Sequence, residues 1–286
     1  MSAADDLDHL DLLAQQVDAL LAEAEDVDLA TPVAACPGWD VGALLDHVGG
    51  TYRWAAAMVR SGTTTRARWR DVVPAPGPDP RTWLRDSADD VLGALRASDP
   101  HAPAWTFGPE ATAGFWRRRL LHETAVHAAD VALSASRTPS TPVAVAQDGI
   151  AEHLLVVPLN PGVAARAAGA APAGPVHLLV EEAEEVLDGS PHLAPGGWWL
   201  VRWDAGGSAV VRSGSGAHSP GVHDPGIHDP GARGPAAHGH GTAARPDVVV
   251  RGRAGDLLLA LWRRADDVVV EGDAGAWRRW SAAHAL

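Results

Sequence analysis

The stretch LHETAVHAAD, residues 121–130, decides how the first half of this chain folds. Glu123 and His127 stand four positions apart, which places their side chains on one face of a helix, about one turn from each other. Asp130 continues the same stripe, and the apolar side chain of Leu120 lies on it as well. Because this face carries large apolar side chains, we expect it to point into the interior of a helical bundle.

A carboxylate and an imidazole that are buried side by side need a partner, since burial of unpaired polar groups is costly. A divalent cation supplies one, because imidazole nitrogen and carboxylate oxygen are ligands of zinc and its neighbours. The pattern differs from the His-Glu-x-x-His zinc motif, because the histidine that follows His122 is five positions away, at His127. We therefore interpret His122 either as a residue that contacts the metal ligands without binding the metal itself or as a surface residue. A hydrogen bond or salt bridge between Glu123 and His127 is the alternative to a metal site.

A third ligand is expected from another helix. The segment WDVGALLDHVGG, residues 39–50, carries His47 in the middle of an apolar helical pattern. Alone, such a histidine would be read as a core residue, but beside Glu123 and His127 it becomes the natural third ligand. Two histidines and one carboxylate leave coordination positions open, which a catalytic metal needs and a structural zinc lacks.

The first half of the chain carries helical spacing in four segments. We expect these helices at about Asp5–Ala24, Asp40–Arg60, Arg81–Ala97 and Thr112–Ala135. The connection Ser61–Pro80 is rich in Thr, Arg, Pro and Gly and is expected to be a long loop. Four helices with one long connection are typical of a four-helix bundle.

In the second half of the chain, runs with the spacing of strands alternate with runs that have the spacing of helices. Short β-branched and tryptophan-rich runs predict strands at Val176–Val180, Trp198–Asp204, Ala209–Arg212, Val248–Arg251 and Val268–Val270. Helical spacing predicts helices at Ala144–Val157, Asp256–Arg264 and Ala274–His284. The fold class is therefore α+β, with a helical domain at 1–142 and an α/β domain at 143–286. Residues 213–245 are Gly-, Pro- and His-rich and are expected to be a disordered insert whose histidines could bind metal weakly.

Composition excludes several classes of function. The 286 residues carry a formal net charge of −13, which argues against nucleic-acid binding and against adhesion to anionic membranes. We find no long apolar run for a membrane span and no signal peptide, so we expect a cytoplasmic protein. The single cysteine, Cys36, forbids an intrachain disulfide, and the absence of lysine removes that residue as a Schiff-base nucleophile.

Three motifs together resemble one known family. Residues 36–47, CPGWDVGALLDH, resemble the opening motif of the mycothiol-dependent maleylpyruvate isomerase family. Residues 122–130, HETAVHAAD, are similar to the second metal motif of that family. Residues 255–264, GDLLLALWRR, followed by VVEGD at 269–273, look like its C-terminal domain. The resemblance covers nearly the whole chain except the segment 213–245.

The resemblance implies a DinB-like four-helix bundle that binds zinc through His47, Glu123 and His127, with water in the open positions. It also implies a sterol-carrier-like α/β domain at the C-terminus. The cofactor would be mycothiol, the low-molecular-weight thiol of actinobacteria. The named activity of the family is the cis–trans isomerisation of maleylpyruvate to fumarylpyruvate, although many members are thiol-dependent enzymes of unknown substrate. The partners would then be a small-molecule substrate and this thiol, and the enzyme an isomerase or an S-transferase.

Such chemistry is physically consistent with the residues. Metal coordination lowers the pKa of a thiol, and the thiolate can add to an activated double bond, which then rotates before elimination. An anionic substrate needs a cation, and arginine binds carboxylates bidentately. We nominate Arg264 as a catalytic contact to substrate or thiol, with a solvated arginine at a helix end as the alternative. Cys36 and Trp39 are interpreted as packing residues, and Asp130 could orient His127.

Two other functions stay open. The chain could be a non-catalytic module that senses metal or binds an apolar ligand, or a metallohydrolase that uses metal-bound water. Thiol dependence and loss of turnover in His47→Ala would indicate the isomerase or transferase. Ligand binding that survives metal loss would indicate the module, and cleavage without thiol would indicate the hydrolase. The metal, the substrate and the oligomeric state are not fixed by the sequence.

Overall fold

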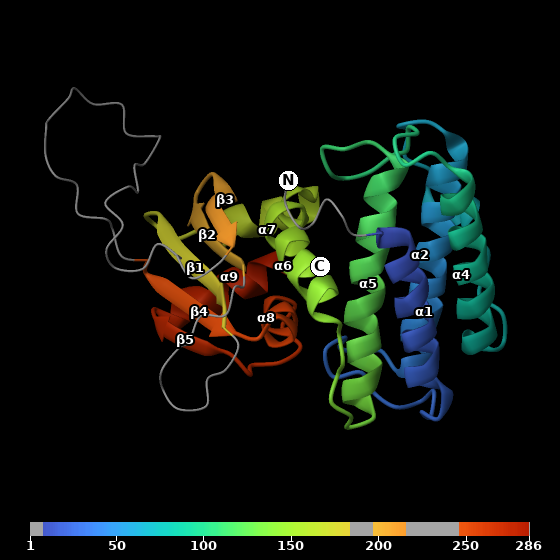
Figure 1. The fold of residues 1–286 in the computed structure, drawn as a ribbon, viewed down its shortest axis with the longest axis horizontal. Coiled ribbons are helices and arrows are strands. Elements are labelled where there is room, and N and C mark those ends of the chain that lie inside the picture. The colour runs from blue at the N-terminus through green and yellow to red at the C-terminus, as the bar shows by residue number, and fades with distance from the viewer. Residues whose placement is uncertain (1–7, 184–196, 216–245, 286) are drawn as a thin grey trace, which may run out of the picture.

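The computed structural model describes residues 8–183, 197–215 and 246–285. Figure 1 shows a bundle of long helices beside a twisted sheet, with helices between the two. The predicted α+β class is confirmed, with a helical N-terminal domain and a C-terminal domain built on a sheet. Among the described residues, no helix is both long and apolar enough to cross a membrane.

Four long helices form the bundle, and side-chain caps fix the starts of three of them. They are α1 (His9–Glu25), α2 (Val41–Ser61), α4 (Pro80–Ala97) and α5 (Ala113–Ser134). Asp8, Asp40 and Asp79 accept hydrogen bonds from backbone N–H groups in the first turns of α1, α2 and α4. A short helix, α3 (Trp69–Val72), interrupts the connection that was predicted to be a loop throughout.

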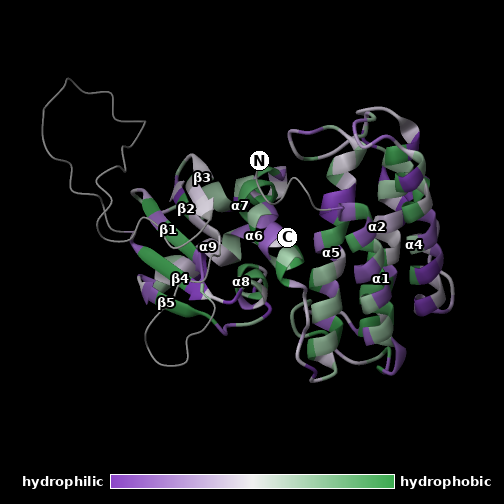
Figure 2. Ribbon diagram, in the orientation of Figure 1, coloured by the Kyte–Doolittle hydropathy of each residue, from purple (hydrophilic) through white to green (hydrophobic). Residues whose placement is uncertain are grey.

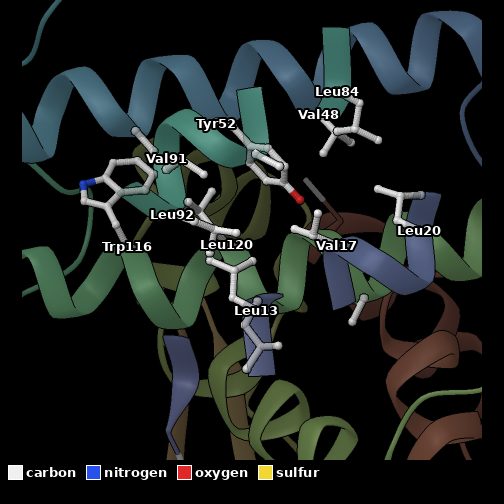
Figure 3. Close-up of a cluster of buried hydrophobic side chains, with 14 of the residues drawn as sticks. Leu13, Val17, Leu20, Val48, Tyr52, Leu84, Val91, Leu92, Trp116 and Leu120 are labelled. Carbon is white, nitrogen blue, oxygen red and sulfur yellow. The ribbon is translucent and has the colours of Figure 1, made fainter. Parts of the chain in front are cut away.

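The bundle core consists of fully buried apolar side chains from all four helices (Figure 3). Helix α1 packs against α5 and α4, and α2 packs against α4 and α5. Each fully buried leucine or valine stabilises the fold by roughly 1.5–3 kcal/mol relative to exposure. Within this core, the Tyr52 hydroxyl lies 2.6 Å from Oγ1 of Thr124 and joins α2 to α5. The hydrogen bond fixes the two helices beside the predicted metal ligands.

Two adjacent glycines in α2 allow tryptophans to approach its backbone. A Cβ atom on Gly49 would lie 2.3 Å from Nε1 of Trp83, and one on Gly50 would lie 2.5 Å from the ring of Trp69. The Trp83 indole donates to the Asp46 carbonyl at 3.1 Å. Close packing, and not a phosphate-binding loop, therefore explains this Gly-Gly pair.

The C-terminal part contains a five-stranded sheet in the order β3-β2-β1-β4-β5. The strands are β1 (Val176–Glu182), β2 (Gly197–Asp204), β3 (Gly207–Ser215), β4 (Val248–Gly252) and β5 (Val269–Gly272). Strands β1 and β4 pair in parallel, with Val180 opposite Val250, and the other pairs are antiparallel. Hydrophobic residues run along β4 (Figure 2), as expected for a strand inside a sheet.

Helices cover the side of the sheet that faces the bundle. They are α6 (Val143–Leu155), η2 (Val157–Leu159), α7 (Pro161–Gly169), α8 (Ala254–Leu261) and α9 (Ala274–His284). Helix α6 contacts α5 and α8, and Val126 of α5 belongs to the C-terminal hydrophobic core. Helix α5 is therefore buried on two sides, which positions its polar residues between the two parts of the chain.

The sequence expectations also differ from the structure in the second half of the chain. Helix α7 was not predicted, although Asn160 caps it and Pro161 begins it, a common start signal. Residues 213–215 belong to β3 and not to the insert, whereas 216–245 lie outside the described residues. Helix α6 begins at Val143, and the division of the chain into 1–142 and 143–286 stays a prediction.

A fully buried histidine, His153, lies among tryptophan side chains of the C-terminal part. His153 of α6 is fully buried, with its ring 4.7 Å from that of Trp262 and 6.2 Å from that of Trp280. No described residue accepts or donates a hydrogen bond at either ring nitrogen. Burial lowers the pKa of His153 to about 3, and the nearby charges of His284 and Arg119 act in the same direction.

This histidine makes the stability depend on pH. In the unfolded chain His153 has its ordinary pKa of 6.5 and binds a proton below that pH. In the folded chain its pKa is about 3, so the same proton binds only near pH 3. Between pH 7 and pH 5, His153 therefore lowers the free energy of unfolding by about 2 kcal/mol. Measured by urea unfolding, the free energy of unfolding of His153→Phe should fall by about 2 kcal/mol less between pH 7 and pH 5 than that of the wild type. His101→Phe, which changes an exposed histidine, should show the same fall as the wild type. Equal pH slopes in His153→Phe and the wild type would contradict the prediction.

Candidate metal centre

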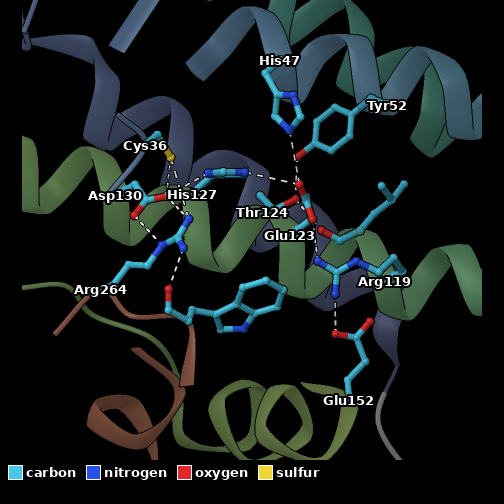
Figure 4. A network of polar contacts seen from close by, with 12 residues as sticks. Cys36, His47, Tyr52, Arg119, Glu123, Thr124, His127, Asp130, Glu152 and Arg264 are labelled. Carbon is cyan, nitrogen blue, oxygen red and sulfur yellow. Dashed lines mark hydrogen bonds and ion pairs between the residues drawn. The ribbon is translucent and has the colours of Figure 1, made fainter. Parts of the chain in front are cut away.

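Two helices bring the predicted ligands together (Figure 4). Glu123 and His127 lie one turn apart on α5, and Nε2 of His127 is 3.3 Å from Oε1 of Glu123. His47, in the middle of α2, directs its Nε2 atom to the same oxygen at 3.5 Å. The three ligand atoms all lie within 4.8 Å of one another. The structure thus gathers His47, Glu123 and His127 around one point.

This arrangement fits a divalent metal ion. Ligand atoms about 2.1 Å from one tetrahedral ion lie roughly 3.4 Å apart, close to the spacings of 3.3 and 3.5 Å between Glu123 and the two histidines. Imidazole nitrogens and a carboxylate oxygen are also donors that zinc, nickel, manganese and iron accept. His47 is partly exposed, with 36% of its side chain accessible, so the centre can be reached from outside.

The carboxylate of Asp130 fixes the orientation of the His127 ring. Nδ1 of His127 donates to Oδ2 of Asp130 at 3.0 Å, one turn further along α5. Arg264, which follows α8, donates to Oδ1 of Asp130 at 3.0 Å and to Oδ2 at 3.2 Å. The Arg264 side chain is only 9% exposed, and it also donates to the carbonyl of Trp262. Arg264, a residue of the C-terminal part, therefore orients the carboxylate of Asp130, which in turn orients the ring of His127.

A second buried arginine holds Glu123. Arg119, one turn before Glu123 on α5, donates to Oε2 of Glu123 at 2.5 Å and to Oε2 of Glu152 on α6. Arg119 is only 4% exposed, and its guanidinium lies 5.5 Å from the centre of the Trp262 ring. Two carboxylates thus neutralise one buried cation, and only Glu123 among them faces the histidines.

These neighbours set the charges of the centre. Burial alone would raise the pKa of Glu123, but Arg119 and hydrogen bonds with His127 and His47 hold it well below its usual range. Burial alone would lower the pKa of His127, but hydrogen bonds with Asp130 and Glu123 raise it to about 9. Glu123 is therefore a carboxylate at neutral pH, which is the form that binds a metal.

A second group of possible ligands shares His127. Cys36, His127 and Asp130 also offer atoms within 4.8 Å of one another, with Cys36 Sγ 3.9 Å from Asp130 and 3.8 Å from Arg264. Both oxygens of Asp130 already accept hydrogen bonds from Arg264, and Arg264 would place a positive charge beside any ion bound there. The set of His47, Glu123 and His127 therefore suits a cation better.

The structure corrects some readings of individual residues. His122 is not at the surface: it is fully buried, and its Nε2 atom lies 2.7 Å from Oδ2 of Asp148, an oxygen that Nε2 of His9 also approaches at 3.0 Å. Cys36 is half-buried beside Asp130 and Arg264 and is more than a packing residue. Arg119 and Glu152 were missed, although Arg119 stands four positions before Glu123, a spacing that favours an ion pair.

The chain is similar to known proteins over both of its parts. Residues 10–132 match the family model of the mycothiol maleylpyruvate isomerase N-terminal domain. A crystal structure of the mycothiol-dependent maleylpyruvate isomerase has a TM-score of 0.55 and 14% identity, and the match covers 95% of this chain and 96% of that chain. A mutant of that isomerase with one histidine changed to alanine has a TM-score of 0.56 and 13% identity, with the same coverage. At these identities the likeness shows the fold alone. No curated protein matches the chain in a sequence comparison.

Metal content tests the centre. We expect the purified wild type to bind one divalent metal per chain, and His47→Ala and Glu123→Ala to lose it, because each removes a ligand. His101→Ala and Glu25→Ala change exposed residues of the same types and should keep the metal. Elemental analysis after dialysis measures all five proteins. Equal metal in the wild type and in both ligand variants would contradict the assignment.

Proposed function

Since residues 10–132 match the model of the mycothiol maleylpyruvate isomerase N-terminal domain, we propose that the chain is a metal- and thiol-dependent enzyme. It acts on a small electrophilic substrate as an isomerase or an S-transferase, with mycothiol as the thiol and zinc as the metal. The observation that carries the proposal is the meeting of His47, Glu123 and His127 from two helices. Glu123 also lines a cavity of about 220 Å³, which borders the centre on the side of this residue.

In this proposal His47, Glu123 and His127 hold the metal. Metal and thiol together would supply a thiolate at neutral pH, whose reversible addition lets an activated double bond rotate. Asp130 accepts the proton on Nδ1 of His127, which leaves Nε2 as the ring nitrogen that faces Glu123. Because the neighbouring carboxylates raise the pKa of His127 to about 9, Nε2 carries a proton in the metal-free chain, and a bound metal would replace that proton.

The arginines keep these groups in position. Arg119 stabilises the charge of Glu123 and directs one of its oxygens away from the histidines, which leaves Oε1 facing them. Arg264 does the same for Asp130 from the C-terminal part. Because its donors engage Asp130 and the Trp262 carbonyl, we assign Arg264 as a positioning residue. Direct contact between Arg264 and substrate stays a prediction of the sequence.

The function is tested by thiol dependence. Zinc-loaded protein should convert maleylpyruvate to its trans isomer only when mycothiol is present, and Glu123→Ala should reduce turnover to background. Glu25→Ala, at an exposed position, should leave it unchanged. Nuclear magnetic resonance distinguishes the two isomers. Cleavage of substrate without thiol would instead support the metallohydrolase, and thiol-independent binding without turnover would support the binding module.

The role of Arg264 predicts a particular kinetic pattern. Arg264→Gln frees Asp130 and His127, so both metal affinity and kcat should fall by about 10-fold or more, whereas KM for the substrate should stay near the wild-type value. Arg264→Lys should recover part of the loss, and Arg263→Gln, at the exposed neighbour, should have no effect. A raised KM with unchanged metal affinity would show that Arg264 contacts the substrate instead.

A further inference from the structure

The cavity that borders Glu123 has an unusual wall. It lies between α2, the loop before α5 and α5 itself, and Asn160 at the start of α7 closes one side. Three tryptophans line it, at positions 54, 105 and 116, together with Phe107. The cavity thus combines an aromatic surface with Glu123, one of the three candidate metal ligands.

The tryptophans form one cluster, in which Trp116 is buried and Trp54 and Trp105 are partly exposed. The ring centre of Trp54 lies 5.3 Å from that of Trp105 and 5.7 Å from that of Trp116. The indole N–H of Trp54 donates to the carbonyl of Ala67 at 2.9 Å, and that of Trp116 donates to the carbonyl of Trp105 at 2.7 Å. Because the N–H edge of Trp54 is already bonded to the protein, the ring surface that this partly exposed side chain adds to the cavity wall is apolar, which favours contact with a flat ring beside the Arg66 guanidinium.

Charge in the cavity is limited to one available cation. The guanidinium of Arg66 lies 5.4 Å from the ring centre of Trp54 and 5.1 Å from that of Trp105, and no described carboxylate pairs with it. The other arginine in the wall, Arg119, is bound by both Glu123 and Glu152. A ligand with two carboxylates would therefore find one partner only, whereas a ligand with one carboxylate would be neutralised by Arg66.

From these observations we propose that the cavity selects a substrate that carries one aromatic ring and one carboxylate. This inference rests on the proposed function, because it names the substrate class of that same site. The ring stacks on the tryptophans, and the carboxylate pairs with Arg66. Dicarboxylates such as maleate and maleylpyruvate lack the ring and bring a second negative charge that has no partner in this wall, so they should bind more weakly and turn over more slowly than a ring monocarboxylate.

Binding of trans-cinnamate, which has one ring and one carboxylate, tests the proposal without catalysis. Calorimetry on metal-free and metal-loaded protein should show one site, at least about 10-fold tighter for cinnamate than for maleate, because ring stacking and one ion pair act together. Arg66→Gln and Trp105→Leu should each weaken cinnamate binding by about 10-fold. Trp105→Phe keeps a ring and should retain most of the affinity, and Arg70→Gln, an exposed arginine outside the cavity, should match the wild type.

Turnover provides a second readout. The compound cis-3-benzoylacrylate has one ring, one carboxylate and a double bond activated by a ketone. Thiolate sulfur would bond to the alkene carbon next to the carboxylate while the π electrons move to the ketone oxygen. Rotation and loss of the same thiolate then restore the double bond in the trans form, so no atom or electron is gained. We expect kcat/KM for this compound to exceed that for maleate by at least about 10-fold, by the same stacking and ion pairing.

The outcomes separate the two proposals. Maleate binding as tight as cinnamate binding, or cinnamate binding unchanged in Arg66→Gln and Trp105→Leu, overturns the substrate class even if maleylpyruvate turnover depends on thiol and metal. Cinnamate binding that requires Arg66 and Trp105 in a protein without thiol-dependent turnover overturns the proposed function. In that case the cavity binds aromatic monoanions, but they are not substrates, and the assignment of a substrate class fails with the function.

Discussion

The structure depends on one carboxylate, that of Glu123, which two imidazoles from different helices approach at 3.3 and 3.5 Å. Such a group is unfavourable inside a bundle unless every oxygen has a partner. Oε2 is satisfied by Arg119, and Oε1 faces His47 and His127. This shared oxygen fixes where α2 and α5 must meet, and the buried bond between Tyr52 and Thr124 supports the same crossing from within the core.

The C-terminal part completes this site. Arg264 reaches Asp130, and Glu152 of α6 reaches Arg119, so a cation and an anion from outside the bundle hold the two charged residues next to the ligands. Trp262 lies beside both arginines, with its ring centre 5.5 Å from Arg119 and 6.0 Å from Arg264. Buried ion pairs of this kind contribute more to position than to stability, because desolvation offsets much of their attraction. The bundle alone would therefore keep the contacts of Asp130 with His127 and of Arg119 with Glu123, but would lack the partners that hold Asp130 and Arg119 in place.

Helical periodicity explains why the meeting of His47, Glu123 and His127 could be predicted from the sequence. The spacing of four between Glu123 and His127 is a local property, and the apolar pattern around His47 already indicated a helix that faces the core. The environment of His122 could not be predicted in this way, because α5 is buried on both sides and a single buried face was assumed. The pair of Arg119 and Glu152 spans 33 residues and depends on how α6 packs, which no local pattern encodes. The aromatic cavity likewise depends on the path of the loop before α5.

The most direct test of the account is the position of the metal. Anomalous scattering from crystals of the zinc-loaded protein locates the ion without reference to activity. The account predicts one zinc with ligands Nε2 of His47, Nε2 of His127 and a carboxylate oxygen of Glu123, each at about 2.0–2.2 Å. An ion bound instead to Cys36 and Asp130, or no ion within reach of Glu123, would contradict it.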